Sequence, residues 1–259
     1  MISNVKLPQG PGYRFVDEVI NRDYVSNSVT GKYFYSGLEE WSLADHFPGN
    51  PIMPASEQLA LMIEDAQKTL KQKNGFLFKI QATNFKKKIT PNTKFYVSIL
   101  SQQNSDKEVM SNCIIVDKFS NELANCLLIF PENNVKPDQN NCLQKHYYYG
   151  TKICHAKNQL LEPGKIIEAM AQNTSQLAQG KPELEGRYFL FQGIEIANFI
   201  ETVTPDTKII LTSTIAWKDI NRYGQAYCQA LVGSNVVATA KIHFAVKKSP
   251  HLDKRVKIV

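Results

Sequence analysis

Apolar residues recur at intervals of three and four in two segments of the chain, the spacing that predicts an amphipathic helix. The first segment carries Leu59, Met62, Ile63, Ala66 and Leu70 on one face. The second, PGKIIEAMAQNTSQLAQ, carries Ile167, Met170, Ala171, Thr174 and Leu177. We expect Ser56 to cap the first helix and Pro163 to open the second.

A different pattern follows each helical segment. Runs of β-branched and aromatic residues with partial alternation are separated by turn residues, which is typical of strands. The runs are KFYVSIL, EVMSNCIIVD and ELANCLLIF in the first half, and KIILTSTIAW, GQAYCQALV and VVATAKIHFAV in the second. The residues Gly233–Asn235 read as a hairpin turn between the last two runs.

The chain also repeats itself. Residues 80–94, IQATNFKKKITPNTK, and residues 194–208, IEIANFIETVTPDTK, are offset by 114 positions and identical at seven of fifteen. A polar segment rich in asparagine and proline, 131–145, reads as a linker between the two copies. We therefore predict two tandem domains, 1–130 and 146–259, each with one helix packed in a mostly antiparallel sheet.

Composition narrows the possible functions. The 259 residues are 43% apolar, enough for a buried core, and carry a formal net charge of +6. No apolar run reaches the roughly 18 residues that span a membrane, and the N-terminal stretch lacks the apolar core of a secretory signal. Aromatic and basic residues are not interleaved as in nucleic-acid-binding motifs. We expect a cytoplasmic protein that binds neither membrane nor nucleic acid.

Cysteine spacing argues against a disulfide framework and against a zinc site. The five cysteines are odd in number and none forms a C-x-x-C pair: Cys113, Cys126, Cys142, Cys154 and Cys228. We expect reduced thiols and no bound metal.

One stretch is unusual. DHFPGNPIMPASEQLALMIEDA, residues 45–66, places His46 before a turn that contains Gly49 and three prolines, and a helix follows. This stretch resembles the active-site segment of the FabA/FabZ-type 3-hydroxyacyl-acyl carrier protein dehydratases. Leu7-Pro8 with RFVDEV (residues 14–19) is similar to their N-terminal stretch, and IIEAMAQ (residues 166–172) to their acid-bearing helix.

The resemblance implies an α+β fold, a double hotdog in which each repeat has a long central helix wrapped by an antiparallel sheet. In that family two hotdogs pair, and each active site takes its histidine from one and its acid from the other. The family's acid position is Ala60 in the first half, whereas the second half supplies Glu168. The resemblance therefore implies one composite site, His46 with Glu168, inside an intramolecular pseudo-dimer.

A remnant of the other site is visible. His155 stands eight residues before Pro163, as His46 stands eight before Pro54, but the residues after His155 no longer match the motif. Its partner would be Ala60, which cannot ionise. We expect the second site to be inactive.

The resemblance implies dehydration of a (3R)-3-hydroxyacyl thioester to the trans-2-enoyl thioester, in fatty-acid or polyketide-type synthesis. His46 would be the base and Glu168 the acid, with Gln172 one helical turn on as a hydrogen-bond partner. Gly49 belongs to the turn after His46. A backbone N–H at a helix start, at Ala55 or Gly164, would stabilise the enolate. The sequence leaves open which of the two faces the substrate.

Several alternatives stay open at this point. Glu57 and Glu64 share a helical stripe with Ala60, and either is an alternative acid. The fold would also suit a hotdog acyl-thioesterase, or a non-catalytic acyl-binding or scaffold protein. The basic run Lys86-Lys87-Lys88 is either a solvated strand end or a dock for an acidic acyl carrier protein. The expected reaction needs no cofactor, because the phosphopantetheine arm arrives with the substrate, on acyl carrier protein or on coenzyme A.

Overall fold

The structure is a computed structural model. It describes residues 18–35, 38–42, 52–70, 78–90, 92–105, 108–131, 142–148, 153–157, 162–178, 181–220 and 222–248. The predicted base His46 and the neighbouring Gly49 lie outside these residues.

Two helices form where the apolar spacing predicts them. Helix α1 spans Ala55–Thr69 and helix α2 spans Pro163–Ser175, with Pro163 in its first turn as expected. The prediction for Ser56 was wrong, because Pro54 occupies the N-cap position of α1 and no side chain caps it. Ser56 instead lies inside the first helical turn and is buried, where its hydroxyl serves another purpose described below.

The strands of the first half of the chain are β1 (Glu18–Asp23), β2 (Ser28–Tyr35), β3 (Leu38–Ser42), β4 (Lys79–Phe85), β5 (Lys94–Ser105), β6 (Glu108–Asp117) and β7 (Glu122–Pro131). Those that follow are β8 (Cys142–Tyr148), β9 (Ile153–Lys157), β10 (Arg187–Phe199), β11 (Thr207–Asp219), β12 (Tyr223–Val232) and β13 (Asn235–Lys248), with short 3₁₀ turns at Gln176–Ala178 and Pro182–Leu184. All six predicted apolar runs are strands, β5, β6, β7, β11, β12 and β13, and Gly233, at φ 61°, makes the predicted turn.

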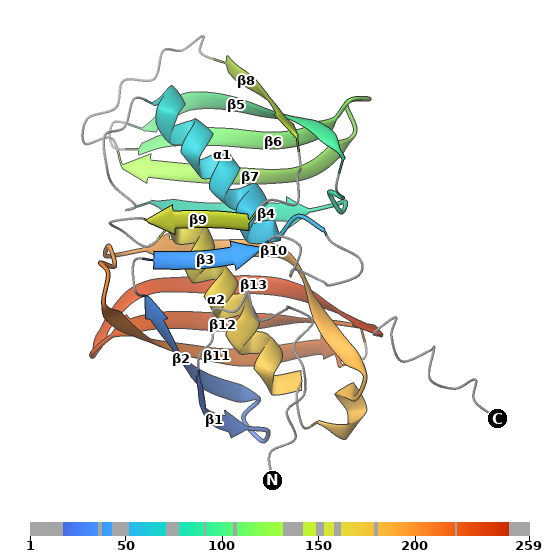
Figure 1. Cartoon of the computed structure of the whole chain (residues 1–259), viewed down its shortest axis with the longest axis vertical. Helices are drawn as coiled ribbons and strands as arrows, with labels where there is room; N and C mark the ends of the chain where they lie inside the picture. Colours follow the sequence, from blue (N-terminus) through green and yellow to red (C-terminus); the bar gives the residue numbers. More distant parts are fainter. Residues whose placement is uncertain are drawn as a thin grey trace, which may run out of the picture.

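One large antiparallel sheet joins the two halves, in the order β1-β2-β11-β12-β13-β10-β4-β7-β6-β5-β8 (Figure 1). Its centre is the pairing of β4 with β10, which carry the first six residues of each sequence repeat. Ile80 pairs with Ala197 and Thr83 pairs with Ile194, so each pair becomes the other when the two copies are exchanged. The two halves are therefore related by a pseudo-two-fold axis through this seam.

Strand pairing does not follow the order of the chain. The predicted division at 1–130, 131–145 and 146–259 would leave β1 and β2 with the first half, yet β2 pairs with β11 of the second. Conversely, β8 begins inside the predicted linker and pairs with β5 of the first half. A separate two-stranded sheet, β3 with β9, also joins residues from both halves.

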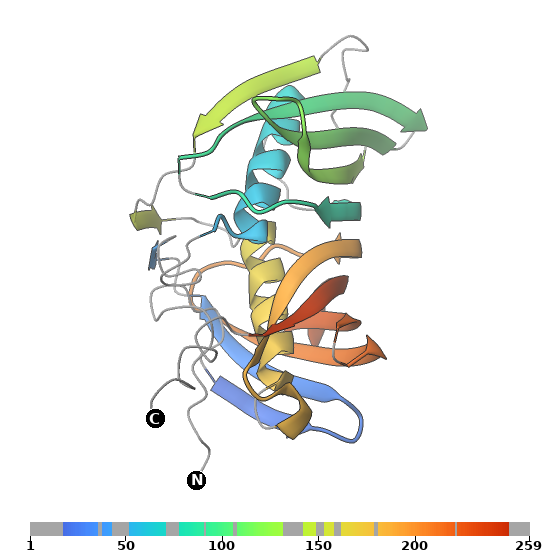
Figure 2. The ribbon, with the colours of Figure 1, turned by 90° about the vertical axis from the view of Figure 1, so that its right-hand side faces the viewer.

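The sheet curves around both helices (Figure 2). Helix α1 packs on β5, β6 and β7, and α2 packs mainly on β11 and β12. The two helices meet at their N-terminal turns, where a Cβ on Gly164 would lie 2.8 Å from the carbonyl oxygen of Ser56. Each half is thus a helix wrapped by an antiparallel sheet, and the predicted double hotdog is confirmed.

Candidate active site

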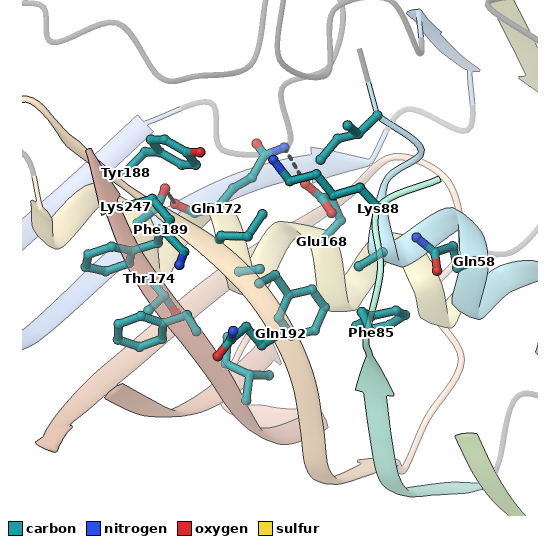
Figure 3. Close-up of a pocket in the computed structure, with 18 of the residues that line it drawn as sticks. Gln58, Phe85, Lys88, Glu168, Gln172, Thr174, Tyr188, Phe189, Gln192 and Lys247 are labelled. Atoms are coloured by element: carbon teal, nitrogen blue, oxygen red, sulfur yellow. Dashed lines mark hydrogen bonds between the residues drawn. The ribbon is translucent and has the colours of Figure 1, made fainter. Parts of the chain in front are cut away.

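A cavity of about 400 Å³ lies where the N-terminal turn of α1 meets the middle of α2 (Figure 3). The first half contributes Met53, Ala55 and Gln58 to its lining, and the second half contributes Glu168 and Gln172. The cavity is therefore built from both halves of the chain. Its α1 side directly follows the segment that carries His46.

Glu168 is the ionisable group buried in this cavity. It is 5% exposed, and the side-chain amide of Gln172, one turn further along α2, donates a 3.0 Å hydrogen bond to its Oε1. The hydroxyl of Ser56, on α1, also donates to this carboxyl. Burial raises the pKa of Glu168 above its ordinary value of 4.5, and the two hydrogen bonds offset only part of that rise. This environment therefore favours the protonated form of the carboxyl more than an exposed position would.

Aromatic rings form the apolar part of the cavity. Phe85 on β4 lies 5.4 Å from Phe191 on β10, measured between ring centroids, so the contact crosses the seam between the two halves. Two residues earlier on β10, Phe189 stacks on Phe244 of β13 with 4.4 Å between ring centroids. These rings give the cavity an apolar wall that an acyl chain can contact.

Lysines make up much of its rim. Lys86, Lys87 and Lys88 follow β4, Lys247 lies near the end of β13, and all four are exposed and line the cavity. Lys86 forms an ion pair with Glu122 at 2.8 Å. The side chain of Lys88 reaches over the Glu168–Gln172 pair in Figure 3. The opening therefore presents positive charge to whatever enters it.

A second, smaller cavity of about 200 Å³ lies on the other side of the helix junction. It contains the N-terminal turn of α2, with Pro163 and Gly164, together with Ala60 of α1. This is the pseudo-symmetric counterpart of the larger cavity, with alanine in the place of the carboxyl. Glu64 also lines it, but that side chain is 57% exposed and forms an ion pair with Lys68.

The structure separates the two helix starts that the sequence left as equal candidates. Ala55 shares the larger cavity with Glu168 and Gln172, whereas Gly164 shares the smaller one with Ala60. Glycine at 164 has a packing reason, because a side chain there would press on the backbone of α1. His155 lies on β9, where its backbone pairs with Glu40, and its side chain is not among those described.

The sequence did not reveal several groups in or beside the larger cavity. Ser56, which donates to Glu168, was predicted to cap the helix, and no role was predicted for Gln58 or Lys247. The alternating Phe189 and Phe191 in RYFLFQG carried a signal, since residues two apart on a strand face the same side. Which cavity that side would face depends on the pairing of β4 with β10, and no local pattern encodes that pairing.

Comparison with known families bears on the first half of the chain. Residues 34–120 match the model of the ApeI-like family, described as ApeI dehydratase. The 3-hydroxyacyl-[acyl-carrier-protein] dehydratase FabZ of Moorella thermoacetica is 34% identical over 93 residues, which are 36% of this chain and 64% of that protein. The chain is therefore similar to a FabZ-type dehydratase over about a third of its length. The resemblance read from the HFPG motif is thereby confirmed, over less than two thirds of the relative's length.

Solved structures share the fold along most of the chain. The dehydratase domain from the CurJ module of curacin polyketide synthase aligns with a TM-score of 0.54 at 12% identity, over 92% of this chain and 98% of that one. The 12:0-ACP thioesterase from Umbellularia californica aligns with a TM-score of 0.53 at 10% identity, over 81% and 94%. The fold of this chain thus also occurs in a thioesterase, so the fold alone does not decide the reaction.

Two features are absent from the residues that the structure describes. No three histidine, cysteine or acidic side chains among them are grouped so that they could hold a metal ion. Within the same part of the chain, no helix is long and apolar enough to cross a membrane.

Proposed function

We propose that this chain catalyses the reversible dehydration of a (3R)-3-hydroxyacyl thioester, carried on acyl carrier protein, to the trans-2-enoyl thioester. The observation that carries the proposal is the buried carboxyl of Glu168, with its raised pKa, in a cavity that also contains the N-terminal turn of α1. The similarity of the chain to a FabZ 3-hydroxyacyl-[acyl-carrier-protein] dehydratase supports the same reaction. Each chain holds one such composite site.

In the proposed reaction His46 removes a proton from C2 of the substrate, and the electron pair moves onto the thioester to form an enolate. The backbone N–H at the start of α1, at Ala55, stabilises the oxygen of that enolate, because the helix dipole directs positive charge there. The enolate then reforms its carbonyl, C2=C3 forms and the C3–O bond breaks.

Glu168 supplies the proton that lets the hydroxyl leave as water. A carboxylic acid can do this only if it is protonated when the substrate arrives, and its raised pKa favours that state. The amide of Gln172 and the hydroxyl of Ser56 orient the carboxyl toward the cavity. The cycle closes when the proton on His46 is returned to Glu168 through solvent. The reaction requires no metal or redox cofactor.

The lysines at the rim are the proposed dock for the acyl carrier protein. Acyl carrier proteins present an acidic surface, and the phosphate of their pantetheine arm is an anion. Lys87, Lys88 and Lys247 border the cavity through which that arm would pass. Positive charge at this opening would speed association and fix the direction of entry.

The decisive experiment measures the formation of enoyl thioester from 3-hydroxyacyl thioesters on acyl carrier protein and on pantetheine. His46→Ala and Glu168→Gln should each lower turnover by roughly 10²–10⁴-fold, the range for losing a positioned base or acid. Glu64→Gln is the matched control, because it makes the same chemical change on α1 beside the smaller cavity. The control should keep activity within a few-fold of the unchanged chain. An equal loss in the control, or no loss in Glu168→Gln, would contradict the assignment.

Mixing tests where the site is assembled. Chains that carry His46→Ala, mixed with chains that carry Glu168→Gln, should remain inactive if each site is built within one chain. Recovery of activity would place the site between chains.

The products formed distinguish the proposed dehydratase from its alternatives. Release of free thiol from an acyl thioester, without enoyl product, would identify a thioesterase instead. If the chain binds the acyl thioester but forms neither product, it is an acyl-binding protein without catalytic activity.

The dock is tested by reversing charge. Lys87→Glu combined with Lys88→Glu should raise KM for the substrate on acyl carrier protein at least several-fold, and more at low salt, because surface attraction is screened by ions. Turnover of the pantetheine substrate should change much less. The control combines Lys118→Glu with Lys208→Glu, which makes the same change of charge, since both lysines are exposed and neither lines the cavity. Equal effects from both variants would show that only net charge matters.

A further inference from the structure

Gln58 holds an unusual polar atom in the larger cavity. The side chain lies in the first turns of α1 and is 3% exposed. Its Nε2 donates a 3.3 Å hydrogen bond to the carbonyl oxygen of Met53. A carbonyl can only accept, so this contact fixes the orientation of the amide and leaves Oε1 turned away from Met53. Among the described residues, that Oε1 is buried and has no hydrogen-bond partner.

Such an atom is costly in a folded protein. A buried acceptor without a donor loses its water and gains nothing in return, so proteins rarely keep one. A leucine or methionine at 58 would fill the same volume between α1 and the cavity without this cost. The neighbouring carboxyl of Glu168 shows the contrast, since both Gln172 and Ser56 donate to it. Gln58, which lines the cavity, therefore carries a buried acceptor whose donor is not supplied by the described part of the protein.

We propose that Oε1 of Gln58 accepts a hydrogen bond from an O–H or N–H of the bound acyl thioester, which makes Gln58 a specificity-determining residue. The inference rests on the proposed function, because it takes the occupant of the cavity to be a pantetheine-linked 3-hydroxyacyl group. Such a substrate offers two sources of donor, the 3-hydroxyl and the amide N–H groups of the pantetheine arm. The shared chemistry is a donor that satisfies the one open acceptor.

The 3-hydroxyl has a particular use for this contact. To be expelled, its oxygen must point a lone pair at the proton of Glu168, so its own hydrogen must point elsewhere. Glu168 and Gln58 lie on different helices and line the same cavity (Figure 3). An acceptor on α1 and an acid on α2 would hold the hydroxyl between them and set its orientation.

The test compares Gln58→Met with Gln67→Met in the full chain. Gln67 lies on the same helix but lines the smaller cavity. Gln67→Met therefore makes the same chemical change as Gln58→Met, outside the larger cavity. Gln58→Met should lower kcat/KM for 3-hydroxyacyl-pantetheine roughly tenfold to hundredfold, since the substrate's donor is then buried without an acceptor. Thermal melting of the free protein should change little, because the unpaired acceptor is removed together with the hydrogen bond to Met53. The Gln67→Met control should keep its kcat/KM.

Stability separates this role from a structural one. If Gln58 served only packing, Gln58→Met would lower the melting temperature and leave kcat/KM of the remaining folded protein unchanged, and that result would overturn the proposal. Unchanged kcat/KM with unchanged melting would overturn it as well. Gln58→Glu keeps an oxygen acceptor at the same reach and should retain more activity than Gln58→Met. If the methionine variant does not fold, this glutamate variant decides, and a loss there beyond tenfold overturns the proposal.

Inhibition by saturated acyl-pantetheine, which has the amide groups but no 3-hydroxyl, identifies the donor. If Gln58→Met weakens this inhibitor as much as it weakens the 3-hydroxyacyl ligand, the donor is an amide N–H. If only the 3-hydroxyacyl ligand is weakened, the donor is the hydroxyl. The failure of the proposed function would look different, because the unchanged chain would then form no enoyl product, and direct binding of the two ligands would still test Gln58 by itself.

Discussion

Single side chains in the larger cavity show how burial sets chemistry at the residue scale. The carboxyl of Glu168 sits among apolar and amide groups, and its surroundings favour the protonated form. The same carboxyl on the exposed face of α1, at Glu64, pairs with Lys68 instead. Position on the two helices, and not residue type, separates a candidate acid from a surface ion pair.

The raised pKa of Glu168 predicts a pH-dependent difference in stability. In the unfolded chain the carboxyl ionises near its ordinary value of 4.5, whereas in the folded chain it ionises at higher pH. Between these two values the folded state holds a proton that the unfolded state has lost, so stability falls as pH rises through this window. Glutamine never ionises. Glu168→Gln should therefore become more stable relative to the unchanged chain as pH rises above about 4.5.

Urea unfolding at a series of pH values measures this difference. Glu64→Gln is the control. The side chain of Glu64 is exposed, and its ion pair with Lys68 lies on the surface, where such pairs contribute little to stability. Its curve should run nearly parallel to that of the unchanged chain. Parallel curves for Glu168→Gln too would show that the carboxyl ionises as easily in the folded protein as in the unfolded one.

The contact between Glu168 and Gln172 could be predicted from the sequence, because a motif carries its own spacing. Glu168 and Gln172 are one helical turn apart, so their contact follows from helix geometry alone. Ser56 was misjudged because serine before an apolar helical run usually caps it, and only the packing of α1 against α2 reveals its other partner. The role of His46 stays a prediction, since it lies outside the described residues.

At the scale of elements, the meeting of the two helices positions the site. Gly164 lets the first turn of α2 approach the backbone of α1 closely enough for Ser56 to reach Glu168. A wider separation would enlarge the junction and move the carboxyl away from the start of α1. The distance between the helices is therefore a determinant of the cavity.

Gly164→Ala should be destabilising. The added Cβ would lie 2.8 Å from a backbone oxygen that cannot turn aside, so the helices must separate. Overpacking of this kind costs about 1–3 kcal/mol. Ala55→Gly, the reverse exchange at the start of α1, should cost less than about 1 kcal/mol. Urea unfolding measures both free energies, and a Gly164→Ala loss no larger than that of Ala55→Gly would show that the junction can relax.

Element type was easier to predict than element partnership. The strands β5 to β7 and β11 to β13 follow from their own composition, because a half-buried strand has a period of two. The exchange of β2 and β8 between halves has no local signature. β2 pairs with β11 and β8 pairs with β5, toward opposite ends of the sheet, and these partnerships are a property of the assembled fold.

At the scale of the whole molecule, the β4–β10 seam makes the two hotdogs one sheet. Gly193 lies on this seam, where a Cβ would come 2.2 Å from the carbonyl oxygen of Thr83. The strand exchange adds further connections across the halves. Neither 1–130 nor 146–259 carries all the strands of one sheet, so we expect neither to fold alone.

One cooperative unfolding transition is therefore expected. Gly193→Ala should lower the free energy of unfolding by about 1–3 kcal/mol, and hydrogen exchange should show the same loss in β6 and in β12, which lie on opposite sides of the seam. Gly233→Ala is the control, because it strains only a hairpin turn, at φ 61° with open space around it, and should cost about 1 kcal/mol. Two separate transitions, one for each half, would contradict a shared sheet.

The unequal cavities have a consequence for inheritance. Two identical subunits read from one coding sequence receive every substitution twice, so an alanine at the acid position would remove the carboxyl from both grooves at once. In a tandem chain, different codons specify the residues of the two cavities. Alanine at 60 and glutamate at 168 can then coexist in one molecule, and each groove is free to accumulate its own mutations while the other keeps its chemistry.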